Sequence, residues 1–166
     1  MSVVEQGRRL SELTVAETMS EGIISVPRTA LLTEVAHLMA SRRIHCVVVD
    51  ELPEDGAGPW GVVSDLDVVA AATVRGLGDQ TAAGTAATAL VTVRSDETLL
   101  RAGQLMTEHA AAHLVVVDPE TGAPVGVLST LDVAAALDGA GGVRRVAPEP
   151  YAAADAAEPY GLGLGG

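Results

Sequence analysis

Several residue types with specialised roles are scarce in this chain of 166 residues. It has one cysteine, so no disulfide can form within the chain, and a reducing cytoplasm fits that content. Lysine is absent: all ten basic residues are arginines, against 22 acidic residues, and the net charge is −12. Nucleic acids require a basic face and anionic membranes repel an acidic protein. We therefore expect no nucleic-acid or membrane partner.

Long apolar segments and aromatic residues are also missing. No run approaches the ~18 apolar residues that a membrane-spanning helix needs. Residues 1–10 contain two arginines and a glutamate in place of the apolar stretch of a secretory signal, so we expect a cytoplasmic protein. Phenylalanine is absent and there are one Trp and two Tyr, although 48% of the residues are apolar. These counts predict a globular chain with an aliphatic core.

The chain does contain one pattern that is used twice. The matching segments are 24–39 with 91–106, 45–50 with 113–118, and 61–67 with 126–132. The offsets between the copies are 67, 68 and 65 residues. Nearly constant offsets indicate one supersecondary unit repeated with loops of different length. Two such units usually pack face to face, and we look for function in the clefts between them.

Each copy predicts the element order β-α-β-β-α. A short β-prone segment precedes an amphipathic helix with apolar residues at helical spacing. A continuous apolar run then predicts a strand covered on both faces, and a second strand leads into an Ala/Val-rich helix. The expected fold is α/β, with two β-α-β-β-α repeats packed with pseudo-twofold symmetry. The predicted boundaries are an arm at 1–13, repeats at 14–76 and 77–139, and a flexible tail at 140–166.

A Ser-x-x-Asp step joins strand to helix in both copies, as Ser64 with Asp67 and Ser129 with Asp132. Free N–H groups and the positive end of the helix dipole at such a place attract anions. The hydroxyl can contact a phosphate or ribose oxygen, and the carboxylate can accept both hydroxyls of a ribose. The same residues also cap helices, which is the structural alternative. Recurrence of the step favours a nucleoside site.

These motifs resemble the cystathionine-β-synthase (CBS) domain, and about 14–138 resembles a tandem pair, or Bateman module. The resemblance rests on Ile24-x-Val26, on the segment from Met39 to Asp50, and on Gly61-x-x-Ser64-x-x-Asp67, each with its second copy. It implies a regulatory module without catalysis or a required cofactor. Such modules bind AMP, ADP, ATP or S-adenosylmethionine between the repeats. The implied ligand-binding residues are Ser64, Asp67, Ser129, Asp132, His45, His113, Ile24, Val26, Val47, Val91, Val93 and Val115.

The two histidines stand at equivalent strand starts, where the resemblance implies a place near phosphate and backbone pairing is the alternative. Cys46 and Leu114 follow the two histidines where the resemblance implies arginine. Other arginines could compensate if they reach the cleft, which spacing does not show: Arg28, Arg42, Arg43, Arg94 and Arg101. The charge of −12 favours a ligand of low charge, AMP or S-adenosylmethionine before free ATP. We expect Cys46 to be a packed strand residue, and we expect no metal site, because adjacent strand residues face opposite ways.

Two functions remain open. One is a sensor that binds an adenosine-type ligand and signals to a protein effector. The other is a ligand-free scaffold, which the acidic charge and the absent arginines would suit. Apolar helix faces at 68–72 and 133–137 predict a homodimer, and no catalytic constellation predicts an enzyme. For the tail, disorder is the expectation, and docking of a partner through Tyr151 and Tyr160 is the alternative.

Overall fold

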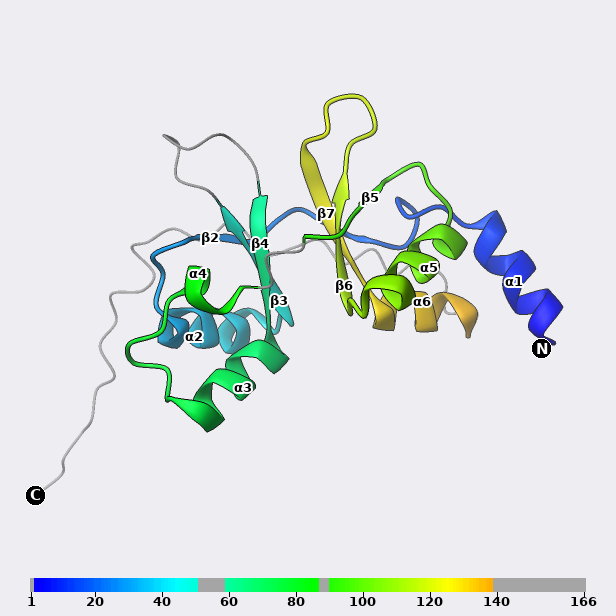
Figure 1. Ribbon diagram of the computed structural model, residues 1–166. Helices are drawn as coiled ribbons and strands as arrows, with labels where there is room; N and C mark the ends of the chain where they lie inside the picture. The colour runs from blue at the N-terminus through cyan, green and yellow to red at the C-terminus, as the bar shows by residue number, and fades with distance from the viewer. Residues whose placement is uncertain (1, 51–58, 87–89, 139–166) are drawn as a thin grey trace, which may run out of the picture.

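The computed structural model describes residues 2–50, 59–86 and 90–138. It has two lobes of similar construction, each with a β-sheet and packed helices, and the sheets lie next to each other toward the middle of the molecule (Figure 1). The predicted α/β class with two β-α-β-β-α repeats is confirmed. The expectations for the tail at 140–166 fall outside the described residues.

The first lobe has a three-stranded sheet in the order β2-β3-β4. Its elements are β2 (Ser25–Pro27), α2 (Leu32–Arg42), β3 (Cys46–Asp50), β4 (Pro59–Ser64), α3 (Asp65–Val74) and the short α4 (Ala82–Thr85). Strand β2 is parallel to β3, whereas β4 is antiparallel to β3. Parallel neighbours need a crossover, and α2 supplies it.

The second lobe repeats this plan and adds two elements from the start of the chain. Its elements are β5 (Thr92–Arg94), α5 (Leu99–His109), β6 (His113–Val117), β7 (Pro124–Ser129) and α6 (Thr130–Leu137), with α1 (Val3–Glu12) and β1 (Ser20–Glu21) added. The sheet order is β1-β7-β6-β5, and β1 is antiparallel to β7. Helix α1 packs against α5 and α6 at the far end of this lobe (Figure 1).

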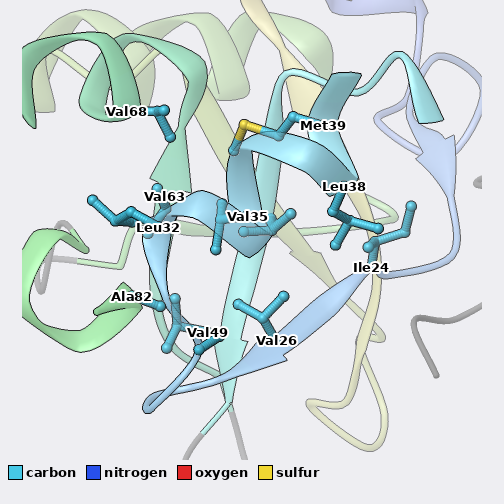
Figure 2. Close-up of a cluster of buried hydrophobic side chains, with 12 residues drawn as sticks. Ile24, Val26, Leu32, Val35, Leu38, Met39, Val49, Val63, Val68 and Ala82 are labelled. Atoms are coloured by element: carbon cyan, nitrogen blue, oxygen red, sulfur yellow. The ribbon is translucent and has the colours of Figure 1, made fainter. Parts of the chain in front are cut away.

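Each lobe has its own aliphatic core. The core of the first lobe lies between the sheet and α2, with side chains from β2, β3, β4, α3 and α4 completing it (Figure 2). Val47 and Val49 point into this core, and Val48 between them is also buried although it faces the other side of the sheet. The prediction that this apolar run is covered on both faces is therefore confirmed.

The two lobes exchange segments. Val15 and Met19, from the start of the first repeat, belong to the core of the second lobe, and Ala82 belongs to the core of the first. Backbone hydrogen bonds hold both segments: Val15 N donates to Glu97 O, and Ala82 N donates to Ala30 O. The boundary between residues 76 and 77 stays a prediction. In space, each lobe is completed by the first residues of the other repeat.

The predicted arm at the start of the chain is largely helix. Ser2 and Glu5 form a capping box at the first turn of α1, which satisfies N–H groups that lack partners within the helix. Arg9 Nε donates to Ala136 O near the end of α6, 2.6 Å away, and Leu10 packs on the second core. Within the part of the chain that the structure describes, no helix is long and apolar enough to cross a membrane.

Candidate ligand cleft between the repeats

A cavity of about 580 Å³ lies between the two lobes. It is lined by Ser20, Gly22, Ile24, Arg42, Arg43, Ile44, His45, Cys46, Asp65, His113, Val127, Ser129, Thr130, Leu131 and Asp132. Both repeats contribute, because the first supplies the turn from α2 to β3 and the second supplies the junction of β7 with α6. Cavities of this size accommodate small molecules in other proteins.

The Ser-x-x-Asp steps have the same geometry in both repeats. In the second repeat, Asp132 Oδ2 accepts hydrogen bonds from Ser129 N at 2.7 Å and from Ser129 Oγ at 2.6 Å, while Asp132 N donates to Ser129 Oγ. Ser64 and Asp67 reproduce these contacts within 0.1 Å. The capping role that sequence offered as an alternative is therefore present in both copies.

The two steps differ in position. Ser129 and Asp132 line the cavity, whereas Ser64 and Asp67 do not line it. Both hydrogen bonds that Asp132 accepts from Ser129 go to Oδ2, so Oδ1 takes no part in the cap. Capping and ligand binding are thus compatible at Asp132.

The turn that enters β3 forms one wall of the cavity. Arg43 follows the last residue of α2 and caps the helix: it adopts the left-handed conformation with φ of 53° and donates its N–H to Met39 O. This turn brings Arg42, Arg43 and His45 to the lining together. The sequence raised five arginines without placing them, and the structure brings Arg42 and Arg43 to this lining, where a guanidinium group can attract an anion. The other three do not line the cavity: Arg28, Arg94 and Arg101.

His45 and Asp65 form a close pair on the same wall. His45 Nδ1 lies 2.9 Å from Asp65 Oδ2, and the backbone N–H of Asp65 donates to His45 O. An ionised carboxylate only accepts hydrogen bonds, so the ring nitrogen is the donor. This bond lowers the pKa of Asp65 below its ordinary value. Asp65 is a lining residue that the sequence reasoning missed, although it lies within the Ser-x-x-Asp step.

His113 occupies the equivalent position in the second repeat. It lines the same cavity and is more enclosed than His45. Burial lowers the pKa of His113, against the opposing effect of the nearby Asp65 carboxylate. Its counterpart of Asp65 is Thr130, which carries no charge. The two histidines therefore reach one site but have different surroundings there.

The apolar residues predicted to hold adenine divide into two groups. Ile24 lines the cavity. Val26, Val47, Val93 and Val115 are at most 3% exposed, and Val91 packs partly buried against the second core. A ligand can meet the four buried valines only through their backbone or after the side chains move. Contact of all five valines with adenine stays a prediction.

Cys46 lines the cavity at the start of β3. Burial raises the pKa of its thiol to about 12, and the carboxylates of Asp65 and Asp132 act in the same direction. The thiol is therefore protonated at neutral pH, which suits neither a nucleophile nor a metal ligand. Among the residues described, no group of three or more His, Cys, Asp or Glu side chains is placed to hold a metal ion.

The CBS domain family profile matches the chain twice, at residues 13–73 and 86–139. These matches cover more than half of the chain, which therefore belongs to the CBS domain family and carries two copies of the domain. A comparison with curated proteins found no match.

Solved structures of CBS domain pairs share this fold. A CBS domain protein from Pyrobaculum aerophilum, complexed with AMP, is 31% identical, with a TM-score of 0.64 over 72% of this chain and 89% of that chain. A CBS-domain containing protein from Agrobacterium tumefaciens is 22% identical, with a TM-score of 0.62 over 70% and 84%. The CBS domain pair of MJ0100, in complex with 5′-methylthioadenosine and S-adenosyl-L-methionine, is 18% identical, with a TM-score of 0.67 over 77% and 98%.

Proposed function

We propose that this protein is a regulatory sensor that binds an adenosine-type ligand in the cleft between its repeats and catalyses no reaction. The observation that carries the proposal is the convergence of Asp132, Arg43 and Ile24 on one cavity. These residues offer an acceptor for ribose hydroxyls, a cation for phosphate and an apolar contact for a base. The AMP complex of the 31% identical relative supports the same ligand class.

The ligand in this proposal is AMP or S-adenosylmethionine. ADP and ATP belong to the same class, but the cavity lining has two guanidinium groups and two carboxylates, so its charges nearly balance. A ligand with few net charges matches such a lining better than a triphosphate does. No resident cofactor is needed in this scheme, because the bound state itself is the signal to a protein effector.

The proposal is tested by calorimetric titration and by thermal denaturation with AMP, ADP, ATP, NAD, S-adenosylmethionine and adenosine. A ligand that binds only the folded state must raise the melting temperature with concentration. Asp132→Asn should reduce the shift strongly, since it removes the carboxylate that would accept the ribose hydroxyls. If none of the six compounds binds the folded protein, the sensor proposal is wrong and the scaffold alternative takes its place.

We also propose that the protein is a homodimer in the cytoplasm and that α3 and α6 form its interface. Leu66 and Val69 on α3 are 71% and 58% exposed, and Leu131 on α6 is 58% exposed. Large apolar residues exposed on helices are typical of surfaces that another protein covers. The equivalent positions of Leu66 and Leu131 in the two repeats suit a symmetric contact with a second copy.

A further inference from the structure

The two repeats differ at one charged position of the cleft. The step reads Ser64-Asp65-Leu66-Asp67 in the first repeat and Ser129-Thr130-Leu131-Asp132 in the second. Asp65 and Thr130 both begin a helix and both line the same cavity. The first repeat therefore contributes the carboxylate of Asp65 to the cavity, whereas the equivalent residue of the second repeat, Thr130, contributes a hydroxyl group.

Asp65 belongs to the wall that carries the arginines. Its carboxylate is bound to His45 at 2.9 Å, and His45 follows Arg43 by two residues in the turn between α2 and β3. Arg42, Arg43 and Asp65 line one cavity, so a phosphate held there by an arginine shares that cavity with this carboxylate. Asp65 lines the cavity and its side chain is 54% exposed, so its charge is not enclosed in the protein.

Resting on the proposed function, we propose that Asp65 is a specificity-determining residue that limits the negative charge of the adenosine ligand. Two arginines can balance the charge of one phosphate group, whereas Asp65 and Asp132 oppose any further phosphate in the same cleft. Repulsion between like charges a few ångströms apart is appreciable in a partly enclosed site. The cleft therefore accepts a monophosphate or a cationic sulfonium ligand and discriminates against a triphosphate.

An alternative role for Asp65 is purely structural: it would stabilise the first turn of α3 and have no effect on ligand selectivity. Its Oδ1 accepts from Leu66 N at 2.8 Å, and an acidic residue in the first helical turn favours the dipole. A structural role of that kind affects stability and would change the affinities for AMP and ATP by the same factor. A charge filter changes their ratio.

The test compares the dissociation constants of AMP and ATP, measured by calorimetry at pH 7.5 with EDTA to remove magnesium. We expect Asp65→Asn and Asp65→Thr to raise the affinity for ATP relative to AMP about fivefold. The threonine variant copies the second repeat, whose helix begins normally with Thr130. Asp79→Asn is the matched control: it removes the same charge from an exposed position outside the cleft.

The outcomes separate this inference from the function on which it rests. An increased ratio in both Asp65 variants, with no change in Asp79→Asn, supports the charge filter. Binding of AMP with an unchanged ratio overturns the filter alone, as does a wild-type protein that prefers ATP. Failure of the wild type to bind AMP, ATP or S-adenosylmethionine overturns both proposals.

Discussion

Thr14 forms an antiparallel β-bridge with Thr98, and its repeat counterpart Thr81 forms the same bridge with Leu31. The two bridges are equivalent at an offset of 67 residues along the chain. Each joins the start of one repeat to the residue that precedes the main helix of the other. The lobes are consequently tied together at two symmetric points, and the cleft between them is a product of this exchange.

The exchange predicts that Val15 stabilises the second lobe. Val15 is 0% exposed and lies in the core with Leu99 and Leu114. Val15→Ala removes buried apolar volume, and we expect the free energy of unfolding to fall by roughly 1–3 kcal/mol in urea denaturation. Val3→Ala is the control, because Val3 is exposed. Equal stability of the two variants would contradict the assignment of Val15 to that core.

Substitution of Asp67 and of Asp132 should affect ligand affinity differently, although the two residues have the same local geometry. Asp67→Asn and Asp132→Asn each weaken a capping box, and we expect each to lose about 0.5 kcal/mol of stability. Only Asp132 lines the cavity. Calorimetry with AMP should therefore show a ten- to hundredfold loss of affinity at this cleft in Asp132→Asn, since a charged hydrogen-bond acceptor is lost. Asp67→Asn should retain that affinity, and an equal loss in both variants would refute the assignment.

Burial of His113 predicts a dependence of stability on pH. Its folded-state pKa lies below the ordinary value, so the unfolded chain binds the proton more readily. The contribution to stability is therefore present above the unfolded pKa and decreases as the pH falls from about 6.5 toward the folded pKa. Urea denaturation between pH 5 and 8 measures this slope.

Two variants isolate the contribution of His113. His113→Gln cannot titrate in this range, and we expect it to flatten the slope of stability against pH. His109→Gln is the control, because His109 is exposed near the end of α5. A slope that survives His113→Gln unchanged would assign the dependence to other groups.

If the exposed apolar residues of α3 and α6 form the homodimer interface, a charged side chain introduced there should weaken the dimer. We expect the wild type to sediment at twice the 16.8 kDa mass of one chain. Leu66→Arg should shift the protein toward the monomer, because a charge placed in an apolar interface is poorly solvated. Val4→Arg on the exposed face of α1 serves as the control. A monomeric wild type would refute the homodimer.

Much of the fold could be predicted from residue patterns because its causes are local. Apolar spacing at 31–39 and 99–106 predicted amphipathic helices, and the runs before Asp50 and Asp118 predicted buried strands. Leu31 proved to be an exposed residue just before α2 and not part of its apolar face. The Ser-x-x-Asp capping geometry also followed from spacing, since a serine and an aspartate three residues apart can meet across the first turn of a helix. Repetition of these patterns then predicted two similar lobes.

The sequence by itself determined the repeat, its element order, the aliphatic cores and the caps at Ser64 and Ser129, because each depends on neighbours along the chain. Only the tertiary structure decided that Val15 and Ala82 complete opposite lobes. It also decided that Asp132 faces the cleft with Arg42, Arg43 and Asp65. These juxtapositions join residues tens of positions apart, and they depend on how two sheets pack and on where a left-handed residue such as Arg43 turns the chain.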